Sequence, residues 1–291
     1  MKLISEKRCI IGEGPLWNDF EQRLYYTNGF GNEICMFDFL SGKLEVRKVK
    51  EGVSAFAFDK NNRLIVSRKD GVFILNDDDT TEELYDTSKI CISHANDMKA
   101  GPDGRIYVGT QSGKRLNLSD ETDGKLFSID ENGSVKVLLD NLILSNGLEW
   151  SLDEKKFYHT DSDTNTIKEY DFDCAKGNIN FTGRSVHVLG VDGFAIDKNG
   201  NLLVACWGQG YIAVVDTKEF KVVSYIKLPA RIPTSCAFAG KNMDILAVTT
   251  ASYGADIEKD KNAGFTLLKP MDVGGRKPYR YKQSNLLQQS K

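Results

Sequence analysis

The sequence has little of several features that define whole classes of protein. Among its 291 residues no apolar run approaches the ~18 residues that a membrane-spanning helix needs. The net charge is -3, which excludes the strong basic excess of a nucleic-acid groove. The first ten residues lack the apolar core of a secretory signal and contain the charged residues Lys2, Glu6, Lys7 and Arg8. We therefore expect a cytoplasmic protein that binds neither nucleic acid nor a membrane.

Cysteine and histidine are also sparse, and their spacing excludes common sites. The six cysteines include no CxxC pair, so we expect reduced thiols buried in the core rather than zinc ligands or a redox pair. The three histidines form neither HxH nor HExxH, which excludes the usual histidine zinc sites. No GxSxG sequence is present, which argues against a serine esterase of the hydrolase type.

The chain does contain a sequence pattern that repeats six times. Each copy has a turn-like residue, a small residue, a short apolar stretch, an Asx or Gly turn and a second apolar strand. Recurrence at a period of 40 to 50 residues is typical of stacked four-stranded units. The copies start at Glu13, Val53, Asn96, Asn146, Asp192 and Thr234.

The stretches within each copy predict strands and no helices. They are short runs rich in Val, Ile, Phe and Tyr, bounded by Gly, Asn and Asp. No longer window keeps a helical period. We therefore predict an all-β six-bladed β-propeller formed as one domain by residues 1–291, in which residues 1–12 pair with the last blade and close the ring.

The repeat register also predicts a functional site. Residues at the start of the innermost strands form a ring at one mouth of a propeller channel, so Glu13, Asn96, Asn146 and Asp192 should converge there. Facing carboxylates repel each other in a partly dry channel, and a divalent cation relieves that repulsion. Carboxylate and amide oxygens suit Ca²⁺, Mg²⁺ or Mn²⁺. Asx residues before glycine also form ordinary turns, which is the simpler interpretation of the same pattern.

Two connections are longer than a hairpin requires, at 111–124 and 251–263. The first is crowded with charge, including Lys114, Arg115, Asp120 and Glu121. Such loops are either solvated insertions or lids over a site. As a lid, the first loop would bring Glu121 to the substrate.

Several motifs together resemble the gluconolactonase, regucalcin (senescence marker protein) and luciferin-regenerating enzyme-like family. The similarity runs from about residue 8 to residue 280. It rests on these segments: Glu13-Gly14-Pro15-Leu16-Trp17, His94-Ala95-Asn96-Asp97, Pro102-Asp103-Gly104-Arg105, Ser145-Asn146-Gly147-Leu148 and Val191-Asp192-Gly193-Phe194.

The resemblance implies a metal-dependent hydrolase that opens a lactone, a sugar lactone or related cyclic ester, to the hydroxy acid. It implies that Glu13, Asn146 and Asp192 bind one divalent metal ion, with Ca²⁺ favoured and Mg²⁺, Mn²⁺ or Zn²⁺ as alternatives. Asp192 would also act as the catalytic base, and Asn96 would contact the substrate or a bound water. Relatives that act on sugar lactones often have Arg where His94 stands, so His94 is either a substrate contact or a plain loop residue.

A non-catalytic alternative stays open from the sequence. The chain could be a calcium-binding or interaction propeller whose metal is structural. The identity of the lactone, the ion used in the cell, any protein partner and the oligomeric state are not predicted.

Overall fold

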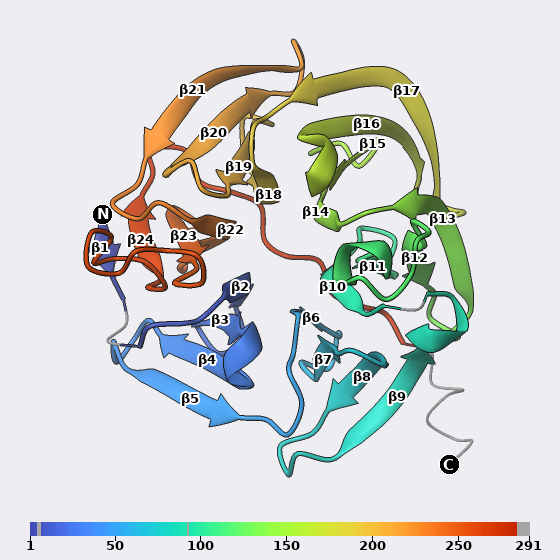
Figure 1. Cartoon of the computed structure of the whole chain (residues 1–291), viewed down its shortest axis with the longest axis horizontal. Helices are drawn as coiled ribbons and strands as arrows, with labels where there is room; N and C mark the ends of the chain where they lie inside the picture. The colour runs from blue at the N-terminus through green and yellow to red at the C-terminus, as the bar shows by residue number, and fades with distance from the viewer. Residues whose placement is uncertain (5–6, 92, 284–291) are drawn as a thin grey trace.

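The computed structural model describes residues 1–4, 7–91 and 93–283. In these ranges the chain forms six four-stranded antiparallel sheets arranged radially about one axis (Figure 1). The helices of the described residues are four 3₁₀ turns: η1 (Gly29–Gly31), η2 (Thr87–Lys89), η3 (Lys114–Leu116) and η4 (Ser162–Thr164). The predicted all-β six-bladed β-propeller is confirmed. No described helix is long and apolar enough to span a membrane.

Each of the first three blades is built from four strands in chain order, the innermost first. Blade 1 holds β2 (Gly12–Asn18), β3 (Arg23–Asn28), β4 (Glu33–Asp38) and β5 (Leu44–Lys48). Blade 2 holds β6 (Ala55–Phe58), β7 (Leu64–Ser67), β8 (Gly71–Leu75) and β9 (Thr81–Asp86). Blade 3 holds β10 (Ala95–Ala100), β11 (Ile106–Thr110), β12 (Gly124–Ile129) and β13 (Val135–Leu142).

Blades 4 and 5 repeat this order, and blade 6 joins the two ends of the chain. Blade 4 holds β14 (Ser145–Trp150), β15 (Lys156–Asp161), β16 (Thr166–Asp173) and β17 (Asn178–His187). Blade 5 holds β18 (Val191–Ile196), β19 (Leu202–Cys206), β20 (Tyr211–Asp216) and β21 (Lys221–Lys227). Blade 6 holds β22 (Pro233–Ala239), β23 (Ile245–Thr250) and β24 (Leu267–Pro270), and its outer strand is β1 (Lys2–Leu3) from the start of the chain. Residues 5 and 6 of the segment 1–12 lie outside the described residues.

Burial decreases from the axis outward, as the sequence pattern of each strand requires. The innermost strands β14 and β18 are buried at every position, whereas the outer strand β21 is mostly exposed. Apolar side chains from adjacent blades form the core between them; the rings of Tyr107 and Trp150, from blades 3 and 4, lie 4.9 Å apart. Five of the six cysteines are buried, as expected, but Cys174 is exposed, because it lies in the turn between β16 and β17.

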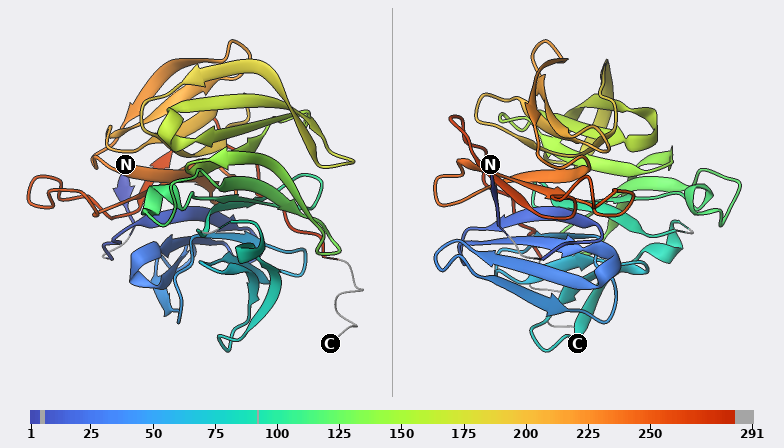
Figure 2. Two further views of the ribbon diagram at one scale, coloured as in Figure 1. Left: turned by 45° about the vertical axis from the view of Figure 1, so that its right-hand side comes forward. Right: turned by 60° about the vertical axis from the view of Figure 1, so that its left-hand side comes forward.

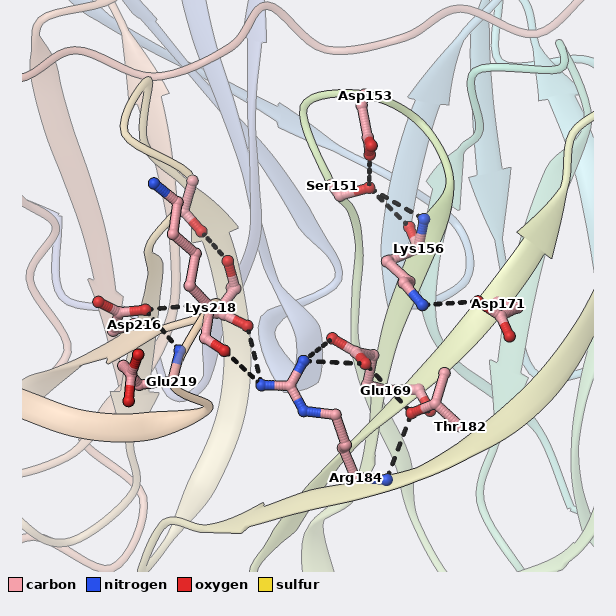
Figure 3. Close-up of polar contacts among 12 residues, drawn as sticks. Ser151, Asp153, Lys156, Glu169, Asp171, Thr182, Arg184, Asp216, Lys218 and Glu219 are labelled. Carbon is pink, nitrogen blue, oxygen red and sulfur yellow. Dashed lines mark hydrogen bonds and ion pairs between the residues drawn. The ribbon is translucent and has the colours of Figure 1, made fainter.

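Polar contacts also join the blades near their rims, as between blades 4 and 5 (Figure 3). The guanidinium of Arg184 on β17 pairs with the carboxylate of Glu169 at 3.1 Å and donates to the backbone oxygen of Lys218 at 2.6 Å. Glu169 is buried, so the ion pair compensates a charge that burial alone would disfavour.

The innermost strands share an irregularity that matters for function. A register shift occurs near the start of β2, β10, β14, β18 and β22, while the printed register of β6 with β7 is regular. A bulge adds a residue to one strand and re-aims the side chains beside it. Gly14 and Gly147 adopt φ values of +54° and +48° within these bulges, a left-handed conformation that favours glycine. At the mouth of the channel, the bulges therefore change the direction in which the side chain before each of these glycines points.

A strap formed by residues 271–282 crosses the other mouth of the channel, where the innermost strands end (Figure 1). It makes backbone or side-chain contacts with all six blades. These contacts include Gly275 to Met243 in blade 6, Gly275 to Asp197 in blade 5, Arg276 to Glu149 in blade 4, Lys282 to Gly104 in blade 3, Tyr281 to Phe58 in blade 2 and Arg280 to Asp19 in blade 1.

The long connection between β23 and β24 extends from the body in both side views of Figure 2. It stands at the mouth opposite the strap, as does the connection between β11 and β12. The two long loops predicted from the sequence therefore border the mouth where the innermost strands begin.

Candidate functional site

Two amides connect blades 3 and 4 at the start of their innermost strands. Asn96, on β10, donates from Nδ2 to Oδ1 of Asn146 at 2.7 Å and to the backbone oxygen of Ser145 at 3.1 Å. Asn146, on β14, donates from its own Nδ2 to Oγ of Ser162 at 3.0 Å. Both amide nitrogens are thus committed to protein oxygens. The orientation leaves Oδ1 of Asn96, and a second lone pair on Oδ1 of Asn146, able to accept from or bind a ligand.

Two carboxylates from other blades act on each other at the same mouth. Burial raises the pKa of Glu13, on β2, to about 8, and the charge of Asp97 contributes to the rise. The N–H of Gly14, which donates to the Glu13 carboxylate at 2.8 Å, opposes the rise. Burial also raises the pKa of Asp192, on β18, well above its usual value, and the charges of Glu13 and Asp97 raise it further. The mouth therefore concentrates negative charge in a place that water solvates poorly.

Asp192 has a buried carboxylate oxygen that no neighbouring group in the described part of the chain satisfies. It is 7% exposed, and its Oδ1 is buried without a hydrogen-bond partner among the described residues. A buried carboxylate oxygen without a partner is costly, and proteins normally satisfy such an atom with a donor, water or an ion.

Asp97 belongs to this cluster although the sequence did not single it out as a site residue. Its Oδ1 accepts the N–H of Met98 at 2.7 Å, and its carboxylate also accepts the N–H of Gly147. Burial raises its pKa, and the positive charge of Lys99 opposes the shift. In a regular strand, Asn96 and Asp97 would point to opposite faces; the bulge between Ala95 and Asp97 changes that alternation. Sequence spacing alone does not reveal such a bulge.

The remaining two positions of the repeat serve packing. Val53 is buried and precedes β6, the innermost strand whose printed register is regular. Thr234 is fully buried, and its hydroxyl donates to the backbone oxygen of Gly12 at 2.5 Å and lies 2.9 Å from the Thr249 hydroxyl. The ring of polar groups is therefore contributed by blades 1, 3, 4 and 5.

A divalent ion fits the chemistry of this donor set. Among the described residues, no group of three or more His, Cys, Asp or Glu side chains stands close enough to hold a metal by itself. The set predicted from the sequence is mixed, with two carboxylates and the amide oxygen of Asn146. The unpartnered oxygen of Asp192 and the mutual repulsion of the carboxylates are what a cation would relieve.

His94 lies just before β10 and is held by neighbouring side chains. Its Nε2 is 3.1 Å from Nε2 of Gln111, and its Nδ1 is 3.4 Å from the hydroxyl of Ser93. Burial lowers the pKa of His94, and the charge of Lys69 lowers it further, so the ring is neutral at pH 7. Among the described residues, these contacts tie His94 to the base of the 111–124 loop.

Glu121 lies on the exposed part of that loop. Its backbone oxygen accepts from the hydroxyl of Ser112 at 3.2 Å, but no described residue forms a hydrogen bond or ion pair with its carboxylate. A role for Glu121 in substrate binding stays a prediction.

The same loop brings a positive charge to the mouth. Arg115, on η3, forms an ion pair with Asp163 on η4, and its charge partly opposes the rise in the pKa of Asp192. Asp163 follows Ser162, the residue that accepts from Asn146. The loop thus reaches from blade 3 to blade 4, and its role as a lid stays a prediction.

Comparison with known proteins reveals similarity over nearly the whole chain. A family model described as the SMP-30/Gluconolactonase/LRE-like region matches residues 11–252. The provisionally named sugar lactone lactonase YvrE of Bacillus subtilis (strain 168) is 31% identical over 286 residues, 95% of this chain and 96% of that protein. Regucalcin of Gallus gallus is 30% identical over 294 residues, 97% of this chain and 98% of that protein. A solved structure of luciferin-regenerating enzyme is 27% identical, with a TM-score of 0.86 and coverage of 95% of this chain and 97% of that chain.

Proposed function

Because this chain belongs to the SMP-30/gluconolactonase/LRE-like family, we propose that it is a metal-dependent lactonase that opens a cyclic ester to its hydroxy acid. The family resemblance drawn from the sequence motifs is thereby confirmed, whereas metal dependence and substrate are part of the proposal. The observation that carries it is the interacting pair of carboxyl groups of half-buried Glu13 and buried Asp192, with an unpartnered oxygen on Asp192, at the mouth opposite the strap.

The residues that would hold the ion are Glu13, Asn146 and Asp192, and Ca²⁺ suits their hard oxygen atoms best. A bound cation would neutralise the carboxylates, polarise the lactone carbonyl and stabilise charge that develops on its oxygen. Asp97 supports the arrangement from behind, because it holds the N–H of Gly147 next to Asn146. No described thiol or imidazole belongs to this set, so a thiolate-preferring ion is disfavoured.

The chain supplies the proton transfer and the orientation. Asp192 accepts the proton of the attacking water and returns it to the ring oxygen when the acyl C–O bond breaks, and Oδ1 of Asn96, whose nitrogen is already bound to Asn146, accepts from that water or from a substrate hydroxyl. A carboxylate beside a cation is a weak base, which limits the acceleration that Asp192 provides. An activated cyclic ester requires little acceleration, so a modest base suffices.

The experiment is a pH-indicator screen of sugar and aliphatic lactones, with chelator and with metal restored. We expect hydrolysis that chelator abolishes and that Ca²⁺, Mg²⁺, Mn²⁺ or Zn²⁺ restores. Asp192→Ala should lose metal binding and turnover together, whereas Asn96→Ala should mainly lose turnover. Asp171→Ala, which removes an exposed carboxylate on β16, is the matched control and should leave both unchanged.

Two outcomes would contradict the proposal. Full activity of metal-free Asp192→Ala would refute the role of both the ion and the base. A chelator that lowers the melting temperature while no lactone is turned over would favour a propeller with a structural metal, and tight Ca²⁺ binding without turnover would favour a calcium-binding role.

A further inference from the structure

The loop between β11 and β12 is fixed at its base and presents a defined tip. The N–H of Gly113 donates to Oδ1 of Asp123 at 2.7 Å, and the hydroxyl of Ser112 lies 3.3 Å from the same oxygen. The Ser112 hydroxyl also accepts the N–H of Lys114 at 3.1 Å. These bonds close the two ends of the loop on each other, so that η3 at its tip is positioned rather than free.

The tip carries Arg115 from blade 3 to blade 4 at the mouth where the innermost strands begin. Its Nη1 pairs with Asp163 on η4, next to the Ser162 hydroxyl that holds Asn146. The positive charge of Arg115 is close enough to Asp192, on blade 5, to oppose part of the rise in the pKa of that carboxyl. One guanidinium from blade 3 is therefore anchored on blade 4 and acts electrostatically on blade 5.

The guanidinium has capacity left for a ligand. Its side chain is 39% exposed, and Asp163 is its one hydrogen-bonding or ionic partner among the described residues, through a single nitrogen. Arginine presents five N–H donors in a planar fork that matches the two oxygens of a carboxylate or phosphate. The Asp163 contact uses one of these donors and leaves most of the fork available.

The charge at the mouth determines what such a donor is useful for. Three carboxyl groups, those of Glu13, Asp97 and Asp192, act on one another at the mouth, so an anionic substituent that approaches them needs a cationic partner. Arg115 is a cationic side chain that acts on Asp192. A neutral lactone does not need this cation, whereas an acidic one does.

We propose that Arg115 determines substrate preference, by binding an oxyanion carried by the lactone at the end away from the reacting carbonyl. The inference rests on the proposed lactonase function and makes it specific: the preferred substrates are lactones with a carboxylate or phosphate substituent. Arg115 is a binding residue at the rim and takes no part in the proton transfer at Asp192.

The test compares neutral, carboxylated and phosphorylated lactones of the same ring size with four proteins. Arg115→Gln should lower kcat/KM for the acidic lactones by on the order of tenfold to a hundredfold, mainly through KM, and leave the neutral lactone within about twofold. Arg115→Lys should keep part of the preference. Lys114→Gln removes a neighbouring charge of the same loop and should have little effect. The carboxylate and phosphate arms show which anion the fork prefers.

Asp163→Asn separates recognition from simple fastening of the loop. If Arg115 only fastens the loop, Asp163→Asn and Arg115→Gln should impair all lactones equally, and that result would overturn the proposal. Under the proposal, Asp163→Asn keeps or increases the preference for acidic lactones, because it releases the guanidinium from a competing carboxylate. A wild-type protein that hydrolyses neutral lactones at least as well as acidic ones would also overturn it while leaving the lactonase function intact.

A binding measurement keeps the inference testable if no lactone is turned over. Calorimetric titration of the metal-loaded protein with an acyclic hydroxy-dicarboxylate should show binding to wild type and to Lys114→Gln, and a loss of at least about tenfold in affinity for Arg115→Gln. Equal affinity for wild type and Arg115→Gln would refute the role of Arg115 whether or not the protein is an enzyme.

Discussion

The mutual repulsion of the channel carboxylates predicts how the metal-free protein responds to pH. Glu13 has an ordinary pKa of 4.5, and in the folded protein burial raises it to about 8. An acid whose pKa is raised by folding stabilises the folded state fully below its unfolded pKa, and this contribution is lost as pH rises through the folded pKa. The metal-free protein should therefore lose stability as pH rises toward and past 8.

The size of the effect follows from the same values. A full shift from 4.5 to about 8 corresponds to roughly 5 kcal/mol, but neighbouring carboxylates share their repulsion, so part of it disappears once one of them is protonated. The cleanest window lies above about pH 6.5, because the buried His159, whose pKa burial lowers to about 3, opposes the trend below that value. Between about pH 6.5 and 9 we expect a loss of about 2 kcal/mol from Glu13.

The assay is urea unfolding in chelator at several pH values across this window, for wild type, Glu13→Gln and Glu219→Gln. Glu13→Gln should flatten the pH dependence, while Glu219→Gln, which removes an exposed carboxylate on the outer rim, should leave it unchanged. Divalent ion at about 100 times its Kd should restore roughly 2.7 kcal/mol at the alkaline end. A metal-free wild type whose stability stays flat or rises between pH 6.5 and 9 would refute the idea that buried carboxylates repel each other here.

Three further predictions test the scaffold around the site. Gly147→Ala should lower the free energy of unfolding in urea by about 2 kcal/mol or more and weaken metal binding, because the φ of Gly147 is +48° and a Cβ would stand 2.1 Å from Cε1 of Phe194. Gly183→Ala is the control: its φ is +86° but the space around it is open, so the loss should be only about 1 kcal/mol. Arg276→Met should destabilise the protein by about 2–3 kcal/mol, since it removes an ion-pair partner from buried Glu149. Lys277→Met, which removes an exposed ion pair with Asp19, should destabilise it by less than about 1 kcal/mol. Equal losses in the two variants would contradict this ranking. Asp97→Asn should leave the circular dichroism unchanged and lower divalent-ion affinity about tenfold in calorimetry, and unchanged affinity would show that Asp97 does not support the site.

The fold was predictable because the sequence pattern that produces it repeats along the chain. Each copy of the repeat predicts two apolar strands and a turn, and stacking such units buries a continuous core. The inner strand β18 is apolar apart from Asp192, which matches its complete burial, whereas β14 is equally buried although it contains Ser145, Asn146 and Glu149. The strap was not predicted, because residues 271–282 have no repeat partner and their contacts are with six different blades.

Only those site residues that occupy equivalent positions of the sequence repeat could be predicted. Spacing alone put Glu13, Asn96, Asn146 and Asp192 at the start of the innermost strands, and the structure has them there. It did not identify Asp97, because a strand pattern assigns consecutive residues to opposite faces and the bulge that alters this is a tertiary feature. Nor did it separate Arg115 from the other charges of its loop, since its position depends on an ion pair with Asp163, 48 residues away in the chain.

Charged side chains along the channel connect the strap to the carboxylates at the opposite mouth. Lys99 opposes the raised pKa of Asp97 and donates to Glu149 at 3.2 Å, and Glu149 in turn pairs with Arg276 of the strap. Negative and positive groups therefore alternate from the open mouth to the closed one, around a cavity of about 70 Å³ that all four of these residues line. Because Arg276 comes from the strap, the segment that closes one mouth also supplies the last charge of this series.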